Sequence, residues 1–469
     1  MSKLTINHLP DELLIEIFDL HRDPPDNELN YQRQWSAEWF KLIHVCKRWR
    51  AVVFASSSRL DLCFVLTPRN GGHMKTIMSR HFPPLPIIIN FPYNYTAKDM
   101  GRVVAALKRP DRIRGIAFTG STGTDDLSKL FKVALPSLES LELCCHGKLK
   151  ISAAFLKGSN LKLRTLKLSG ITLPSISRLL LSAPALTCLS LEILGIDASV
   201  GPSSVTSLLS HLQGLPCLLS LDLKINSYGN PDIDYLAQPK EIVQLLKLTS
   251  FSYHGHSAYF NILAAWFASP SLQEVYIGTN DKSLPNLPHL PRFIDDIGEH
   301  YHTVKVFLDI DRSGFLFSLF SRSECVSDRP SPCFRFSSTS FPESMMQMDS
   351  AFLEKLTGIQ ELYVITDDRS ENFIPWRRFF LQFSSIKALR LEGTTQQRSL
   401  VAAILLQEHE ESNRALLPAL EEIELSVGRR SIYEDQRVSE LAAFEPFMSA
   451  RQQGGSPVKI FWSPCWRVF

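Results

Sequence analysis

The sequence lacks any apolar run long enough to cross a membrane, and this absence argues against a membrane-spanning protein. A membrane-spanning helix needs about 18 uninterrupted apolar residues, and no stretch of the chain approaches that length. The first residues, Met1-Ser-Lys-Leu-Thr5, also lack the apolar core of a secretory signal. We therefore expect a soluble protein of the cytoplasm, the nucleus or both, with no membrane partner.

The chain is also short of net charge and of cysteine. Its 50 basic residues are nearly balanced by 48 acidic ones, which gives a formal charge of +2. Proteins that bind nucleic acid carry a strong basic field, so we expect no nucleic-acid partner. The nine cysteines follow no spacing rule, which favours reduced thiols over a disulfide framework.

Motifs of catalysis and cofactor binding are missing too. The sequence has no phosphate-binding loop, dinucleotide fingerprint, zinc-protease motif or nucleophile elbow. Cys144-Cys145-His146 sets thiols beside an imidazole, but adjacent residues of an extended chain point apart. His254 and His256 have no thiol or carboxylate at metal-ligand spacing. The sequence therefore predicts no catalytic residue, no metal site and no cofactor.

One leucine-containing frame, by contrast, is abundant. The frame is L-x-x-L-x-L, as in Leu138-Glu-Ser-Leu-Glu-Leu143, and it recurs roughly every 23 to 34 residues with a helical pattern before most copies. The closing apolar pairs of the copies are Ile116 and Phe118, Leu141 and Leu143, Leu166 and Leu168, Leu189 and Leu191, Leu221 and Leu223, Phe251 and Tyr253, Val275 and Ile277, Val304 and Val306, Leu362 and Val364, Leu389 and Leu391, and Ile423 and Leu425. Residues two apart face the same side of an extended chain. We predict an α/β solenoid of helix-strand repeats with a parallel inner sheet, wound right-handed like other crossover connections.

Polar segments divide this array. Residues 226–239, 278–291 and 321–350 are rich in proline, asparagine, aspartate or serine and predict long loops. A short run at Phe334-Arg-Phe336 preserves a degenerate repeat inside the third loop, and residues 458–462 predict a last strand. The predicted organisation is a helical module at 1–56, connecting strand and helix units at 57–112, and the solenoid at 113–469.

The N-terminal module begins with a short helix. Pro10 stands at its start, and two acidic residues follow where the helix dipole is positive. The helix carries one broad apolar stripe, made of Leu13, Leu14, Ile17 and Phe18. A second helical pattern runs from Leu42 to Val53. So small a module has a poor core of its own, so we expect it to lean on the solenoid or on another protein.

The residues of this module carry a family resemblance. The run Leu9-Pro10-Asp-Glu-Leu13 with Ile17-Phe18, followed by Leu42-Ile-His-Val-Cys-Lys-Arg-Trp49, resembles the F-box, which docks onto the Skp adaptor of cullin-based ubiquitin ligases. A polar insertion at 21–37 departs from the usual pattern. By the resemblance, the adaptor surface and the module's own small core would be made by Leu9, Pro10, Leu13, Ile17, Phe18, Val45, Cys46 and Trp49.

With the repeats behind it, the chain is similar to the F-box and leucine-rich-repeat proteins abundant in mushroom-forming fungi. The resemblance implies a non-catalytic substrate-recognition subunit of an SCF-type ubiquitin ligase. Its partners would be a Skp-type adaptor, a cullin bound through that adaptor, and an unknown target protein. Two alternatives stay open. One is a repeat scaffold whose N-terminal helices only cap the solenoid, and the other is an enzyme with a reactive cysteine.

The residue between the two apolar members of each pair faces away from the core. These residues are Glu142, Lys167, Ser190, Asp222, Ser252, Tyr276, Lys305, Tyr363, Arg390 and Glu424. Solenoids usually bind proteins on their concave strand face, and tyrosine and arginine are enriched at binding hot spots. We therefore predict target binding at Tyr276, Lys305, Tyr363 and Arg390; a merely solvated face is the alternative.

Overall fold

The computed structural model divides the chain into two compact units. Unit 1 comprises residues 1–194 with 214–218, and unit 2 comprises residues 195–213 with 219–469. The structure describes residues 6–20, 39–57, 59–60, 62–67, 85–91, 97–120, 133–149, 162–171, 180, 183–194, 208–226, 242–279, 289, 301–309, 314–321, 334–338, 359–366, 377, 380–381, 383–392, 395–411, 416–426 and 434–463.

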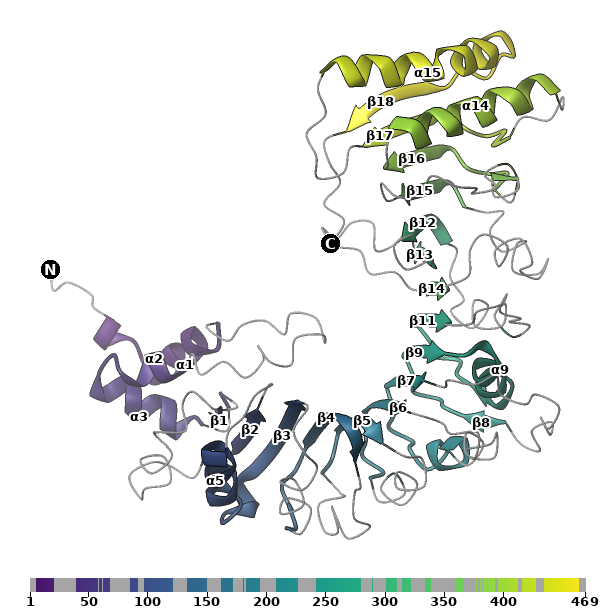
Figure 1. Ribbon diagram of the computed structural model, residues 1–469. Coiled ribbons are helices and arrows are strands. Elements are labelled where there is room, and N and C mark those ends of the chain that lie inside the picture. Colours follow the sequence, from purple (N-terminus) through teal and green to yellow (C-terminus); the bar gives the residue numbers. More distant parts are fainter. Residues whose placement is uncertain are drawn as a thin grey trace, which may run out of the picture. The chain divides into compact units, whose positions relative to one another are not determined.

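Unit 1 starts with helices and continues as a sheet. The helical part comprises η1 (Ile6–His8), α1 (Asp11–Leu20), α2 (Trp39–Ile43) and α3 (Lys47–Ala55). The sheet part comprises β1 (Phe64–Leu66), β2 (Ile87–Phe91), α5 (Ala97–Ala106), η4 (Pro110–Arg112), β3 (Ile113–Gly120), β4 (Ser140–Leu149), β5 (Thr165–Ile171) and β6 (Cys188–Leu194). Strands β1 to β6 pair in sequence order and are all parallel (Figure 1).

Unit 2 continues the alternation of strands and helices. Its elements are β7 (Ser220–Asn226), β8 (Val243–Gln244), β9 (Ser250–Gly255), α9 (Ser257–Trp266), β10 (Phe267–Ala268), β11 (Glu274–Thr279), β12 (Tyr301–Asp309), β13 (Gly314–Ser321), β14 (Phe334–Ser338), β15 (Glu361–Thr366), β16 (Ala388–Glu392), α14 (Thr395–Glu411), β17 (Glu422–Ser426), α15 (Glu434–Gln453) and β18 (Lys459–Ser463). The order within its sheet is β7-β9-β11-β14-β13-β12-β15-β16-β17-β18, and β8 pairs separately with β10.

The apolar pairs of the repeat form the core. Wherever their side chains are described, they are only 0–4 % exposed, because each pair points from its strand toward the same side of the sheet. Helices α5, α9 and α14 lie where the sequence predicts helices before strands. The predicted fold class, an N-terminal helical module followed by a parallel-sheet α/β solenoid, is confirmed.

Backbone hydrogen bonds join each repeat to the next at the start of its strand. The carbonyl of Glu139 accepts bonds from Arg164 N (2.8 Å) and Thr165 N (3.0 Å), and the carbonyl of Leu219 does the same for Thr249 N and Ser250 N. The same arrangement recurs at Arg164, Thr249, Gln360 and Lys387. One shared acceptor per repeat therefore fixes the register of neighbouring strands.

A tight turn introduces several of these strands. Leu138 N donates to Leu135 O at 3.1 Å, and Pro136 between them presets the backbone angle that the second turn position needs. Similar bonds join Leu186 to Ala183, Leu218 to Leu215, and Leu272 to Ser269, each with a proline after the first residue. This proline turn is a second repeated sequence feature, and it is not part of the leucine frame.

One region departs from the all-parallel prediction. β13 is antiparallel to both β12 and β14, and β14 pairs parallel with β11. Only residues 310–313 connect β12 to β13, and a connection so short joins antiparallel strands, whereas a parallel pairing needs a long crossover. The antiparallel strand β13 is a local departure from the parallel sheet, and the leucine frame does not predict it.

The interruptions of the array are tested only in part. The run Phe334-Arg-Phe336 is the strand β14, as the degenerate repeat predicts. The rest of the predicted loop at 321–350 lies almost wholly outside the described residues, as do nearly all of those at 226–239 and 278–291. The predicted domain boundaries stay predictions.

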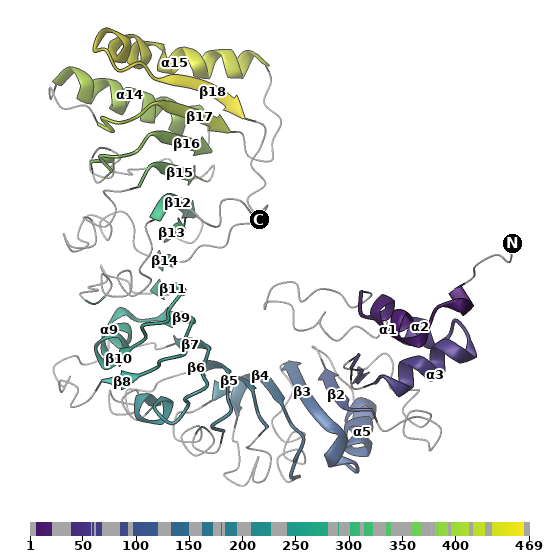
Figure 2. The same cartoon turned by 180° about the vertical axis from the view of Figure 1, so that it is seen from behind.

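Near the C-terminus, β18 confirms the predicted last strand, but the helix before it was not predicted. α15 packs against α14, and Figure 2 shows the two helices side by side. The burial of Phe444, Phe447 and Arg451 marks one side of α15, at a helical spacing that the sequence does display. None of the described helices, α15 included, has the length and apolarity that a membrane crossing requires.

Candidate functional site

Helix α1 presents two apolar faces, and only one of them is covered. Leu14 and Phe18 are buried, whereas Leu13 is 44 % exposed, Ile17 is 37 % exposed and Leu20 is more exposed still. Residues three and four apart lie on one side of a helix, so Leu13, Ile17 and Leu20 form a continuous stripe, hereafter the α1 stripe. The described part of the chain leaves this stripe open.

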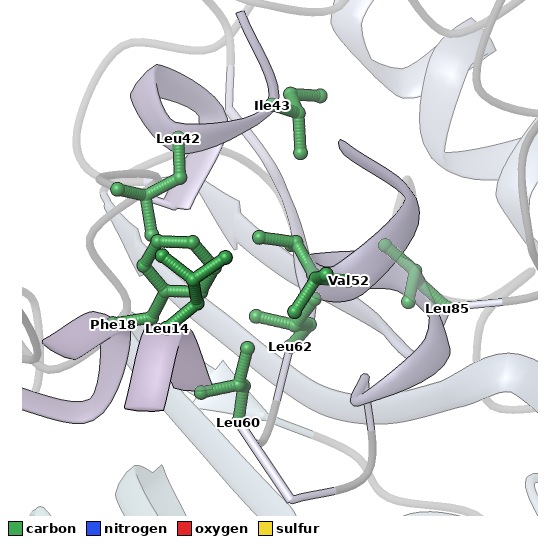
Figure 3. Close-up of a cluster of buried hydrophobic side chains, with 9 residues drawn as sticks. Leu14, Phe18, Leu42, Ile43, Val52, Leu60, Leu62 and Leu85 are labelled. Atoms are coloured by element: carbon green, nitrogen blue, oxygen red, sulfur yellow. The ribbon is translucent and has the colours of Figure 1, made fainter. Parts of the chain in front are cut away.

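The buried face of α1 belongs to a core shared with the start of the sheet (Figure 3). The core collects residues from α1, α2 and α3 and from the segments that lead into β1 and β2, namely Leu14, Phe18, Leu42, Ile43, Val52, Val53, Leu60, Leu62 and Leu85. Trp49 packs beside it, with its ring 4.8 Å from that of Phe18. The module thus leans on the first strands of unit 1, as its small size predicts.

Polar contacts fix the start of α3 and the start of α1. Cys46 caps α3, because its sulfur accepts a hydrogen bond from Trp49 N at 3.4 Å. Arg48 reaches back to α1, where its Nη2 lies 2.6 Å and its Nε 3.1 Å from Asp11 Oδ1. The same Nη2 donates to the carbonyl of Leu9. Arg48 therefore holds the Leu9-Pro10-Asp11 segment against α3.

The structure divides the predicted adaptor-binding residues into two groups. Those that are buried, packed against the core or used as a cap are Leu9, Phe18, Cys46 and Trp49. Those that face solvent are Pro10, Leu13, Ile17 and Val45, the last 58 % exposed. Sequence reasoning missed two contributors, Leu20 and Arg48. The spacing of Leu20 from Leu13 and Ile17 signals the first, while no local pattern reveals the long-range contact of the second.

In unit 2, the predicted target-binding residues lie on one register row that crosses the sheet. In strand order the row reads Asp222, Ser252, Tyr276, Arg335, Ser318, Lys305, Tyr363, Arg390, Glu424 and Phe461. Strands β14 and β13 stand between Tyr276 and Lys305, which places these two positions about 15 Å apart at ordinary strand spacing. Lys305, Tyr363 and Arg390 are immediate neighbours, so the row brings three of the four together. It also adds Arg335, which sequence reasoning missed.

Tyr363 and Arg390 form a connected cluster with two glutamates. The Arg390 guanidinium lies 4.6 Å from the centre of the Tyr363 ring. Its Nη1 is 3.2 Å from Glu424 Oε2, and its Nη2 is 3.7 Å from Glu361 Oε2. Burial raises the pKa of the Tyr363 hydroxyl; Arg390 opposes the rise, and Glu361 and Glu424 add to it. The positive charge of Arg390 is therefore compensated within the chain.

The other candidate constellations have structural roles or remain untested. His256 precedes α9, where its Nδ1 accepts a bond from Ala258 N at 3.2 Å and its carbonyl accepts one from the Tyr253 hydroxyl at 2.6 Å. The Cys145 and His146 side chains lie outside the described residues. Within the described segments, no group of three or more metal-ligating side chains is assembled.

The chain thus combines a small helical module with the first strands of a parallel-sheet solenoid. Residues 6–63 match the family model described as F-box-like. That stretch spans η1, α1, α2 and α3 and reaches Leu60 and Leu62 of the shared core. No curated protein matched the chain. The chain thus carries an F-box-like domain at its N-terminus, followed by a parallel-sheet solenoid.

Proposed function

We propose that this protein is the substrate-recognition subunit of an SCF-type ubiquitin ligase. The observation that carries the proposal is the α1 stripe, an apolar surface left open inside a domain that matches the F-box-like model. Exposed apolar patches on soluble proteins mark interaction sites. F-box domains bind Skp-type adaptors, so such an adaptor is the partner that we assign to the stripe.

The separation of the predicted residues into exposed and buried ones suggests which of them touch the adaptor. In this proposal Pro10, Leu13, Ile17 and Val45 touch the adaptor, with Leu20 extending the surface. The remaining predicted residues act indirectly, because they hold α1 and α3 in place through Leu9, Phe18, Cys46 and Trp49.

The solenoid would present the target. A parallel-sheet array offers a large open face for protein binding. From the family resemblance we propose that this array belongs to the leucine-rich-repeat class found in mushroom-forming fungi. In this scheme a cullin joins through the adaptor and the chain itself performs no bond chemistry. The proposed place of action is the cytoplasm, the nucleus or both.

A capped scaffold is the second candidate, and one observation favours it. Leu60, Leu62 and Leu85 share the core of the helical module, so the helices already seal the first strands of the sheet. Capping and adaptor docking use different faces of α1, and the two roles are compatible. The α1 stripe is what the scaffold alternative leaves unexplained.

Binding of the full chain to a purified Skp-type adaptor tests the proposal. The variant Leu13→Asp with Ile17→Asp should weaken binding by about 100-fold or more, because a buried carboxylate without a partner costs several kcal/mol. The matched control is Leu246→Asp with Leu381→Asp, which makes the same chemical change at two exposed leucines of unit 2. The control should bind like the parent chain, and both variants should keep the parental circular dichroism spectrum. Failure of the parent chain to bind, or equal binding by the α1 variant, would leave the scaffold as the better description.

A further inference from the structure

A serine followed by proline lies in the turn that joins α15 to β18 (Figure 1). Five residues of the chain are a serine or threonine directly before a proline, namely Thr67, Ser269, Ser331, Ser456 and Ser463. Only Ser456 also has a basic residue three positions later, Lys459. A serine with proline at the next position and a basic side chain two positions beyond is the pattern that proline-directed protein kinases accept, so the fit of the surrounding structure decides what this match means.

The end of α15 presents Ser456 at the surface. Gly455, two residues past the helix, adopts the left-handed conformation, with φ = 74°. Ser456 N then donates to Arg451 O at 3.0 Å, which is the bond that closes a glycine-terminated helix. Residues 452–457 are all exposed, and residues 456–458 belong to no helix or strand. The Ser456 side chain is therefore within reach of a kinase.

Ser269 shows the opposite environment. It is 1 % exposed, and its Oγ lies 2.9 Å from Leu248 O and 3.1 Å from Leu245 O. A hydroxyl bonded in this way inside the core cannot enter a kinase active site while the repeat stays folded. The chain thus offers one serine-proline site that the fold presents and one that the fold conceals.

The residues that follow Ser456 are held by the sheet. Val458 is buried, and Lys459 N donates to Glu421 O at 2.9 Å. A kinase cleft that takes up residues 456–459 must first lift them from β17. Among the described strands, β18 pairs with β17 alone, so this opening breaks hydrogen bonds on one side only. Strands at the edge of a sheet open locally at a lower cost than strands inside it.

We propose that Ser456 is a phosphorylation site of a proline-directed kinase. In the transfer, the hydroxyl oxygen of Ser456 attacks the γ-phosphorus of ATP. The bond from Oγ to phosphorus forms while the bond from that phosphorus to the bridging oxygen of ADP breaks, and a base of the kinase takes up the hydroxyl proton. Lys459 pairs with an anionic group of the kinase, which adds affinity for the bound serine. The site does not depend on the proposed ligase function.

The phosphate changes the charge at the end of α15. It carries about −1.5 to −2 charges at neutral pH, and the carbonyl end of a helix dipole is itself negative. Arg451, in the last turn of α15, is buried and directed at the carbonyls of Pro418 and Leu420. Lys459 carries a single positive charge and compensates only part of the phosphate. Phosphorylation therefore disfavours the turn as it stands and favours opening of β18.

Incubation of the full chain with ATP and a purified cyclin-dependent kinase tests the proposal. Peptide mapping by mass spectrometry should find phosphate on Ser456 and none on Ser269. Lys459→Gln should lower the initial rate at Ser456 about tenfold, because an ionic contact with the kinase is lost. Lys247→Gln makes the same change at another exposed lysine of unit 2 and should keep the parental rate. Val458→Ala should raise the rate about fivefold or more, because the smaller side chain holds the segment less firmly against the sheet.

Two results would overturn the assignment: no phosphate on Ser456 in the folded chain, or an equal loss of rate in Lys459→Gln and Lys247→Gln. Phosphate on Ser269 would overturn it too, because the kinase would then be acting on unfolded chains. Amide hydrogen exchange reports the effect of the modification. Residues 459–463 should exchange faster in the phosphorylated chain than in the unmodified one, and unchanged exchange would refute the loosening of β18.

Discussion

The variant Leu14→Ala tests how the N-terminal module is stabilised. Leu14 is fully buried in the core that α1, α2 and α3 share with the first strands. Deleting a buried leucine side chain to alanine costs about 2–5 kcal/mol, because apolar contacts are lost and a cavity remains. Leu60, Leu62 and Leu85 border the same core, so we expect the loss to reach the chain that leads into β1 and β2. Amide hydrogen exchange should accelerate about 30-fold or more in α1, α3 and residues 62–67 and 85–91.

Leu13→Ala is the matched control for this prediction, since it makes the same chemical change one residue earlier in the same helix. Leu13 lies in the open α1 stripe, so its truncation should cost less than about 1 kcal/mol and leave the exchange pattern unchanged. The two variants should also differ in adaptor binding, where Leu13→Ala weakens contact without weakening the fold. Equal destabilisation by both changes, or acceleration confined to α1 in Leu14→Ala, would refute the shared core.

Three further predictions concern Gly255 and Glu392 of unit 2 and Gly101 of unit 1. Gly255→Ala should destabilise the protein by about 1 kcal/mol or more in urea titration, because the added Cβ would stand 2.6 Å from the carbonyl oxygen of Ile225. Gly101→Ala in α5 meets no atom within 4 Å and should instead stabilise by about 0.5–1 kcal/mol. Burial raises the pKa of Glu392, and Arg398 opposes the rise, so the charged form of Glu392 is disfavoured in the folded chain. At pH below about 4, Glu392 of the parent is protonated in both the folded and the unfolded chain, so Glu392→Gln should match the parent's stability there. As the pH rises toward neutrality, the variant should become increasingly more stable than the parent, because the parent must bury a charged carboxylate.

The leucine frame predicts the solenoid well because it reports burial directly. Positions such as Leu141 and Leu143 must leave water together, and only an extended chain in a stacked array lets every copy do so. The same reasoning predicts that the helical module has an apolar core, but it does not predict which apolar residues of α1 are buried and which are exposed. Leu13, Leu14, Ile17 and Phe18 form one stripe in sequence, and nothing local states which half another segment covers. That distinction depends on Leu60, Leu62 and Leu85, which come later in the chain.

The order of the strands sets a similar limit on the target-binding face. Tyr276 and Lys305 belong to consecutive repeats of the leucine frame, yet β13 and β14 insert between them. A repeat pattern predicts which side chains of each strand point toward the core. Which strands pair with each other depends instead on the length and direction of every connection. The register row was therefore predictable, but the spacing of Tyr276 from the other three residues was not.

The sign of the charge on that face depends on how many outward positions are read. The middle residues of the apolar pairs offer Lys305 and Arg390 as cations on either side of Tyr363. Strands β15 to β17 have additional outward positions two residues before or after, and these carry Glu361, Glu392 and Glu422. Because the charges of such close neighbours act together on an approaching partner, these glutamates offset the cations of the row. Arg390 then acts as the internal counter-charge that lets the carboxylates of Glu361 and Glu424 stand close together.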